Sequence, residues 1–240
     1  MGSLQVGSRH RLLCGDSTKA EDVERLMGGE LVDACLTDPP YGTASESKVQ
    51  KRGNKIETFN IEWDKETPQG WIRVAVAHAS PGAAFISFYD RSEMTTLWRR
   101  YEAANIRPLQ CVYWEKPIAP SPRPNFCSCV EVGVFGRVKD GKVRCWNGGG
   151  ATSNVFRYPR SAGHERTSHP TQKPLRLWHD LLRIITDRSH LVFDPFLGSG
   201  TTIVAAENLG RRCYGMEFDP GYCDVIVERW KTLTGEEAIR

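Results

Sequence analysis

The sequence lacks the long apolar segment that a membrane protein needs. Its longest apolar runs, such as Leu191–Phe193 and Ile203–Ala206, are far shorter than the roughly 20 residues that cross a bilayer. No secretory leader is recognisable. With 40% hydrophobic and 25% charged residues in 240, the composition is that of a globular protein and names no activity. We therefore expect a globular chain with no membrane partner.

Paired cysteine motifs are also missing. The eight cysteines are scattered, and no Cys-x-x-Cys pair occurs among them. The closest pair, Cys127 and Cys129, has its neighbouring cysteines and histidines at irregular distances, which is poor spacing for zinc ligands. We expect reduced thiols, no metal site and a reducing, cytoplasmic location.

The chain has little net charge, but that charge is unevenly distributed. A formal charge of +3 is too small to indicate a nucleic-acid partner. Between Arg137 and Lys173, however, eight basic and two acidic residues give a local charge of +6. An ordinary solvated surface explains such a run equally well. The run indicates a binding surface only if catalytic motifs accompany it.

Seven short apolar segments are typical of strands buried on both faces. They lie around residues 12–14, 32–37, 84–89, 110–115, 130–135, 191–194 and 213–217. Helical patterns lie between several of them, at residues 71–78, 93–103, 175–185, 202–209 and 222–233. Strands that alternate with helices predict a mainly parallel, layered α/β sheet.

Two long polar stretches interrupt this alternation, and no domain boundary is evident, so we expect residues 1–240 to form a single domain. Residues 43–62 are polar and basic, and residues 137–168 are rich in glycine, arginine and serine. Loops of this length in compact domains are usually functional or mobile. We expect 43–62 to be a mobile loop.

A glycine-rich turn follows the predicted strand 191–194. Gly198 and Gly200 allow the backbone to approach a ligand, while Ser199, Thr201 and the helix amides can bind polar groups. No lysine follows the glycines, which excludes an ATP- or GTP-binding Walker loop. Alone, such a turn is more often an ordinary connection.

Glu217 ends the predicted strand 213–217, 19 positions after Gly198. At this spacing an acid can accept hydrogen bonds from ribose hydroxyls. A simple surface acid is the alternative. The turn and the acid together predict a cofactor that contains a nucleoside.

The tetrapeptide Asp38-Pro39-Pro40-Tyr41 follows the predicted strand 32–37, at the strand end where α/β sheets place ligands. Two prolines make the loop rigid and leave carbonyl acceptors. An aromatic amine is a poor nucleophile, and hydrogen bonds to the Asp38 carboxylate and to the Pro39 or Pro40 carbonyl would direct its lone pair toward an electrophile. Tyr41 offers a face for a flipped base, worth roughly 1–3 kcal/mol. A rigid turn with a capping Asp38 is the structural alternative.

Together these motifs resemble the β class of amino-methylating DNA methyltransferases, which modify adenine N6 or cytosine N4. Residues 38–41 look like its catalytic motif and residues 194–202 like its cofactor motif, in the permuted order of that class. Two further segments, His169–Pro174 and Leu13–Asp16, also match. The resemblance covers about residues 10–230.

The resemblance implies S-adenosylmethionine as the cofactor and a Rossmann-like, seven-stranded, mostly parallel sheet with one reversed strand and helices on both faces. Lys173 would meet the methionine carboxylate, and Asp16 the adenine ring. The cofactor-binding candidates are Asp16, His169, Lys173, Asp194, Phe196, Gly198, Ser199, Gly200, Thr201 and Glu217.

The implied partner is double-stranded DNA, and the implied target-recognition region is the short stretch 137–168. Its shortness suggests that recognition is relaxed, or shared with residues 43–62 or with a second subunit of a homodimer. The DNA-binding candidates are Lys48, Lys51, Arg52, Lys55, Arg144, Arg157, Arg160 and Arg166.

Aspartate at the first catalytic position is more typical of adenine-N6 than of cytosine-N4 enzymes in this class. We therefore predict a DNA adenine-N6 methyltransferase that flips its target base and transfers the methyl group directly. The alternatives are a cytosine-N4 DNA methyltransferase, an RNA methyltransferase and a binding module without catalysis.

Overall fold

A computed structural model describes residues 4–40, 48–52, 55–59, 68–117, 129–159 and 172–239. Four residues predicted to be functional lie outside these ranges, namely Tyr41, Arg160, Arg166 and His169. For the four basic residues predicted to bind DNA between positions 48 and 55, only the backbone is described.

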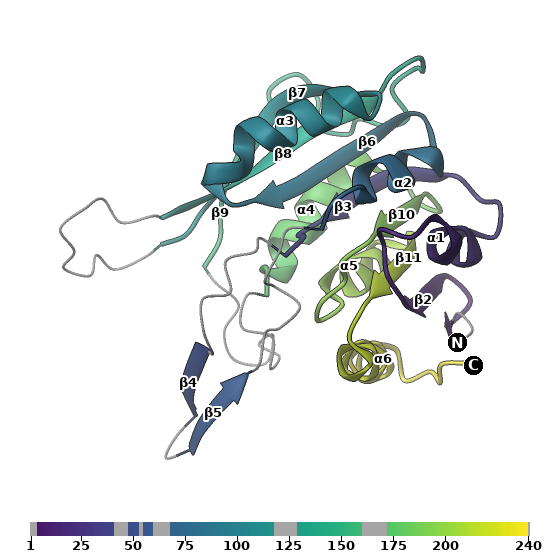
Figure 1. The fold of residues 1–240 in the computed structure, drawn as a ribbon, viewed down its shortest axis with the longest axis vertical. Helices are drawn as coiled ribbons and strands as arrows, with labels where there is room; N and C mark the ends of the chain where they lie inside the picture. Colours follow the sequence, from purple (N-terminus) through teal and green to yellow (C-terminus); the bar gives the residue numbers. More distant parts are fainter. Residues whose placement is uncertain are drawn as a thin grey trace.

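A nine-stranded sheet forms the centre of the protein (Figure 1), in the order β1-β2-β11-β10-β3-β6-β8-β7-β9. The strands are β1 (Leu4–Val6), β2 (His10–Cys14), β3 (Val32–Thr37), β6 (Ala79–Tyr89), β7 (Ile106–Glu115), β8 (Val130–Val138), β9 (Val155–Arg157), β10 (Leu191–Asp194) and β11 (Arg212–Glu217). Seven of them are the predicted strands. The other two, β1 and β9, are edge strands of three residues each, too short to show a periodic pattern.

The sheet is mostly parallel. Strands β2, β11, β10, β3 and β6 pair in parallel, as do β7 and β9. Strand β8 runs antiparallel to both of its neighbours, β6 and β7, and is the reversed strand among the predicted seven. Strand β1 is also antiparallel to its neighbour β2. The predicted fold class is confirmed, with two more edge strands than expected.

Helices cover both faces of the sheet. Helices α1 (Ala20–Met27), α2 (Trp71–Ala77) and α3 (Met94–Ala103) pack on one face, and α4 (Leu175–Ile185), α5 (Thr201–Leu209) and α6 (Pro220–Thr234) on the other. Each face has its own apolar cluster. Strand β3 contributes side chains to both clusters: Ala34 and Leu36 belong to one, and Val32 and Cys35 belong to the other. None of the described helices is long and apolar enough to cross a membrane.

The parallel strands end at one edge of the sheet, which we call the carboxyl edge. There Glu217 of β11 lies beside Cys14 of β2, and Thr37 of β3 lies beside Ser87 of β6. The reversed strand β8 begins at this edge. Both predicted halves of the site therefore come to the same side of the sheet. The opposite side is called the amino edge.

The prediction of a loop over residues 43–62 is wrong for part of that stretch. Strands β4 (Lys48–Arg52) and β5 (Lys55–Phe59) pair antiparallel in a two-stranded sheet separate from the main one (Figure 1). Closely spaced lysines and arginines hid the strand pattern. The rest of the stretch lies outside the described residues.

Residues 137–168 were predicted to be a short target-recognition region, and this stays a prediction; the described part of the stretch is divided between the two edges of the sheet. Strand β8 is reversed and its last residues, Arg137 and Val138, lie at the amino edge. The chain stays at that edge at least as far as Asn147, whose N–H donates to the Ile184 carbonyl at the end of α4, 2.8 Å away. Within the described part of the stretch, β9 returns to the carboxyl edge, beside β7.

Candidate active site

A buried hydrogen bond joins the two predicted halves of the site. Thr37, the last residue of β3, donates through its hydroxyl to Asp194 Oδ1 at 2.7 Å. Asp194 ends β10, is 2% exposed, and also accepts from the Thr202 hydroxyl in α5 and from Phe196 N, 3.0 Å away. Burial raises the pKa of Asp194 to about 6, against the opposing effect of these donors. Asp194 is thus a structural link between the motifs.

The glycine turn between β10 and α5 requires glycine at two positions. Gly198 has φ 54° and Gly200 has φ 80°, both in the left-handed region. The predicted polar groups beside them face inward. Arg229 of α6 donates to the Ser199 carbonyl at 3.0 Å and to the Thr201 hydroxyl at 3.2 Å. Ser199 and Thr201 therefore anchor the turn to α6.

Glu217 closes the other side of this turn. Its carboxylate accepts hydrogen bonds from Gly198 N at 2.8 Å and from Asp219 N at 3.0 Å. Burial raises the pKa of Glu217 to about 7, although both backbone donors favour the ionised form. This geometry holds a strong acceptor at the carboxyl edge, where the sequence predicted it.

Asp16 lies on the adjacent segment, directly after β2. Gly15 N donates to the Glu217 carbonyl at 3.0 Å, which brings the two segments together. The Asp16 carboxylate accepts from Thr18 N at 3.0 Å and from the Thr18 hydroxyl at 2.7 Å. Asp16 therefore has a structural role in the turn before α1 and lies on the segment next to Glu217, while its contact with the cofactor stays a prediction.

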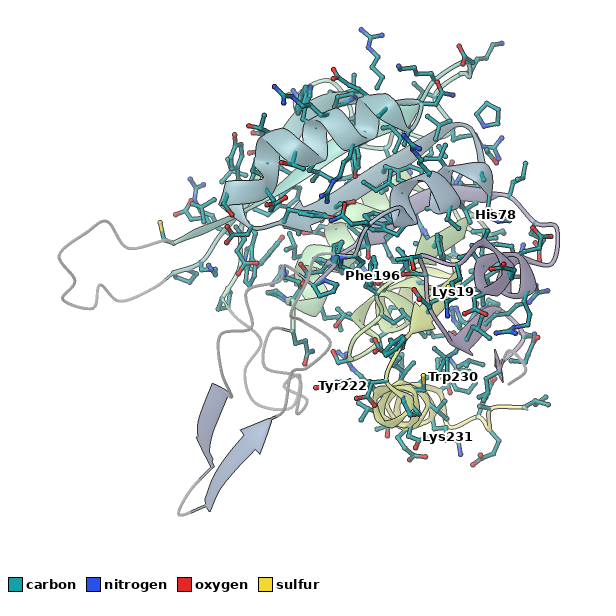
Figure 2. The ribbon with its side chains drawn as sticks, viewed as in Figure 1. Lys19, His78, Phe196, Tyr222, Trp230 and Lys231 are labelled. Atoms are coloured by element: carbon teal, nitrogen blue, oxygen red, sulfur yellow. The ribbon has the colours of Figure 1, made fainter. Side chains whose placement is uncertain are left out.

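Aromatic side chains also lie at this edge. Phe196, predicted from the cofactor motif, packs edge-on against Trp71 of α2 with ring centroids 5.5 Å apart. Sequence reasoning missed Phe218, which directly follows Glu217 and is 67% exposed. Its signal was an apolar residue immediately after the strand-ending acid. Figure 2 labels Phe196 and Tyr222, which lie after β10 and in α6.

The catalytic motif leads into a row of alternating charges. Lys173, directly before α4, forms ion pairs with Asp38 Oδ2 and with Glu131 Oε2, the latter at 3.1 Å. Glu131 in β8 accepts in turn from Lys116 Nζ, directly after β7, at 2.9 Å. We call Asp38, Lys173, Glu131 and Lys116 the charge chain. Next to it, Pro39 is buried and Pro40 half-buried.

The charge chain favours the ionised forms of Lys173 and Glu131. Burial alone would lower the pKa of Lys173, but the Asp38 and Glu131 carboxylates outweigh it and raise that pKa. Burial would likewise raise the pKa of Glu131, yet Lys173 and Lys116 lower it. Lys173 was expected at the cofactor carboxylate, which stays a prediction; the structure pairs it with Asp38 of the predicted catalytic motif. Glu131 and Lys116 were missed, because single charges at strand ends have no distinctive sequence pattern.

The described residues predicted to bind DNA divide between the two edges. Arg144 pairs with Asp33 at the start of β3, with 3.0 Å between Arg144 Nε and Asp33 Oδ1. It therefore lies at the amino edge, away from Asp38, and its contact with DNA stays a prediction. Arg157 lies at the carboxyl edge, is 73% exposed and pairs with Glu115 at 2.8 Å.

The residues at the ends of β2 and β11 fit a nucleoside. Glu217 supplies an acceptor that suits ribose hydroxyls, and Asp16 an acceptor that suits a base amino group. Phe218 offers an exposed apolar ring between these segments and α6. The two carboxylate acceptors and the exposed ring together suit the adenosine part of S-adenosylmethionine.

Comparisons with known proteins agree with this geometry. A family profile for N6/N4 methyltransferases, described as DNA methylase, matches residues 136–228. The Type II methyltransferase M2.DpnII of Streptococcus pneumoniae is 26% identical over 227 residues, covering 85% of this chain and 84% of that protein. M2.MboI of Moraxella bovis is 27% identical over 228 residues, covering 85% and 82%.

Solved structures share the fold. The M1.HpyAVI–SAM complex has a TM-score of 0.71 at 23% identity and covers 92% of this chain and 98% of its own. The cytosine-N4-specific PvuII DNA methyltransferase has a TM-score of 0.66 at 17% identity, covering 96% and 94%. The overall fold of this chain is therefore similar to that of these solved methyltransferases.

Proposed function

We propose that this chain is a member of the N6/N4 family of DNA methylases, to which its sequence is similar, and that it transfers a methyl group from S-adenosylmethionine to adenine N6 in double-stranded DNA. The observation that carries the proposal is the 2.7 Å hydrogen bond from Thr37 to Asp194. It holds the segment that would orient the base against the segment that would bind the cofactor, at one edge of the sheet.

Asp38 and the proline carbonyls act on the amino group of the base. Both N–H groups donate, one to the Asp38 carboxylate and one to the carbonyl of Pro39 or Pro40, which draws the nitrogen lone pair out of the ring. When bound, S-adenosylmethionine would supply a methyl group on a sulfonium; the nitrogen would take it in line, S-adenosylhomocysteine would leave, and the nitrogen would release one N–H proton to solvent. Orientation of this kind lowers a barrier by up to about 7–11 kcal/mol. Asp38 thus works as an acceptor, and no covalent enzyme intermediate is needed.

The cofactor is held by groups at the ends of β2 and β11. The Glu217 carboxylate accepts from the ribose hydroxyls, the Phe218 ring packs on the adenine, and Asp16 accepts from the adenine amino group. The left-handed backbone of Gly198 and Gly200 lets the turn approach the ligand closely. These contacts would place the reactive methyl toward the end of β3, which lies beside β10.

Adenine is proposed because aspartate stands at position 38. The fold does not choose between bases, since the PvuII enzyme, which is cytosine-N4-specific, shares it. Mass spectrometry of digested DNA, after incubation with the protein and labelled cofactor, is expected to find N6-methyladenine. Finding N4-methylcytosine alone would overturn the choice of base. In a parallel incubation with RNA, label found in the RNA and not in the DNA would overturn the choice of DNA.

The role of Asp38 is tested by the variant Asp38→Ala, with Asp224→Ala as the control. Asp224 is an exposed residue of α6 and undergoes the same chemical change. Transfer of labelled methyl to DNA is expected to disappear in the first variant and to persist in the second. Equal transfer by Asp38→Ala and the parent would refute the mechanism.

Other parts of the proposal concern the setting of the enzyme. Arg157, exposed at the carboxyl edge, is the described basic residue best placed to contact DNA phosphates. A homodimer and a cytoplasmic location stay predictions. The mass of the protein–DNA complex, measured by light scattering, tests the first, and fractionation of producing cells tests the second.

A further inference from the structure

The charge chain brings together four segments that are distant in the sequence. Asp38 follows β3, Lys173 precedes α4, Glu131 lies in β8 and Lys116 follows β7. Its two lysine side chains are almost fully buried, with 4% exposure for Lys173 and 6% for Lys116. Burying such charges costs several kcal/mol per ion, and apolar replacements are often as stable. Stability alone therefore does not explain the arrangement.

We propose that Lys173 and Glu131 are positioning residues for Asp38. Glu131 holds the Lys173 ammonium, and that ammonium holds the Asp38 carboxylate ionised and in one orientation toward the amino group of the target base. The inference rests on the proposed function, in which Asp38 accepts a hydrogen bond from that group.

Rigid elements support both ends of the chain. Lys116 N donates to the Cys129 carbonyl at 2.7 Å, which ties the end of β7 to the start of β8. Glu131 lies in β8, paired with Trp114 in the sheet register. Asp38 follows Thr37, which is anchored to Asp194 by the hydrogen bond described above. Side chains held between such elements keep one geometry, as an oriented catalytic group requires.

Lys173 is anchored by its own neighbours. It precedes Pro174, whose carbonyl accepts from Leu177 N at 3.1 Å in the first turn of α4. Its ammonium also lies 5.7 Å from the centre of the Phe88 ring in β6. The lysine stem is therefore packed, and its charged end is directed at two carboxylates at once.

The charge balance argues against the other role of Lys173, as a partner of the cofactor carboxylate. Among the described residues of the charge chain, two carboxylates, Asp38 and Glu131, face two ammonium groups, Lys173 and Lys116. A third carboxylate would compete with Asp38 and Glu131 for the Lys173 ammonium and would lie close to two like charges. The contacts favour a lysine that serves the catalytic aspartate.

The two roles are separated by measuring cofactor affinity and methyl transfer independently. In Lys173→Met we expect the single-turnover rate at saturating cofactor to fall roughly 100-fold, because a carboxylate is misplaced. The affinity for S-adenosylhomocysteine, measured by calorimetry, should stay within about twofold, since an unchanged site binds equally. Lys173→Arg, which keeps the cation, should recover part of the rate.

Glu131→Gln tests the chain one step further from the base. We expect the rate to fall about tenfold with unchanged cofactor affinity. In this variant the Lys173 ammonium keeps its ion pair with Asp38 and loses the one with Glu131. Glu30→Gln is the matched control. Glu30 also forms an ion pair, with Arg212, but near the amino edge. Its rate should equal that of the parent.

The pH dependence of the single-turnover rate also tests the inference. It would not change in the variant if Lys173 had a purely structural role. Among the described residues, the charged groups shown to act on Asp38 include Lys173 and, with opposite sign, Asp194, whose pKa is raised to about 6 by burial. Losing the Lys173 ammonium disfavours the ionised Asp38. The acidic limb should therefore move to higher pH in Lys173→Met, and stay in place in Glu30→Gln.

Two results would overturn the inference. One is a large loss of S-adenosylhomocysteine affinity in Lys173→Met with a normal rate at saturating cofactor, which would assign Lys173 to the cofactor. The other is a Glu131→Gln variant, folded by circular dichroism, with the rate and pH profile of the parent. A parent that transfers no methyl to DNA would overturn the proposed function itself, whereas an active parent with either result refutes the inference alone.

Discussion

Lowering the pH from 8 to 6 is expected to weaken cofactor binding through Glu217. Burial raises the pKa of this carboxyl group to about 7. Its ionised fraction then falls from about nine-tenths at pH 8 to about one-tenth at pH 6. The neutral acid is a poorer acceptor for two ribose hydroxyls than the carboxylate.

The size of the effect follows from that fraction. If only the carboxylate binds the ribose, the apparent Kd rises about tenfold between pH 8 and pH 6, or about 1.4 kcal/mol. Asp194 titrates in the same window, with a pKa of about 6. Since it is about half protonated at pH 6, its contribution is at most about twofold.

Calorimetric titration with S-adenosylhomocysteine at pH 8, 7 and 6 measures this change. Glu217→Gln is the control, because an amide does not titrate. Its affinity is expected to be weak at all three pH values, with only the small change due to Asp194. A parent affinity that is constant over this range, or a tenfold change that persists in Glu217→Gln, would refute the reasoning.

Thermal unfolding separates this effect from acid denaturation. A carboxyl group with a raised pKa in the folded state takes up a proton more readily there than in the unfolded chain. Its contribution to stability is therefore complete below its ordinary pKa and is lost as the pH rises through about 7. Glu217 should thus raise the Tm of the ligand-free protein on acidification from pH 8 to 6, opposite in sign to the change in affinity.

Three further outcomes are expected. Phe218→Ala should raise the Kd for S-adenosylhomocysteine without lowering the Tm, because the ring is 67% exposed and supports little of the core; a normal Kd by calorimetry would contradict its role. Trp178→Phe should lower the free energy of unfolding by about 1–3 kcal/mol, since it loses the buried 2.7 Å hydrogen bond to Thr202; urea titration measures this, and an unchanged midpoint would refute it. Arg144→Ala should leave DNA affinity and its salt dependence unchanged while reducing stability through the loss of its Asp33 contact, and a weaker gel-shift affinity would return Arg144 to the DNA surface.

The sequence predicted most of the fold because its central elements carry strong local patterns. Strands β3 and β10 are fully buried and read as short apolar runs, and six buried apolar residues give α4 a clear face. Helix α1 and the edge strands β1 and β9 are short and were missed. Strands β4 and β5 were hidden by their lysines and arginines. Pattern reasoning fails where an element is short or polar on both faces.

The candidate site was predicted wherever one local segment contains the whole signal. Asp38 with its two prolines, the left-handed Gly198 and Gly200, and Glu217 at a strand end need only the neighbouring residues to be recognised. The basic run that begins at Arg137 was read correctly as a charge excess. The place of this basic run in the fold was not predicted, because the reversal of β8 sends the first part of the run to the amino edge.

The sequence by itself therefore determined the α/β fold class, the resemblance to the methyltransferase family and the two motifs, since each depends on residues close together in the chain. The tertiary structure alone decided which distant charges meet. It placed Lys173 between Asp38 and Glu131, directed Arg229 at Ser199 and Thr201, and paired Arg144 with Asp33. Contacts of this kind depend on strand order and direction, which no local pattern of residues contains.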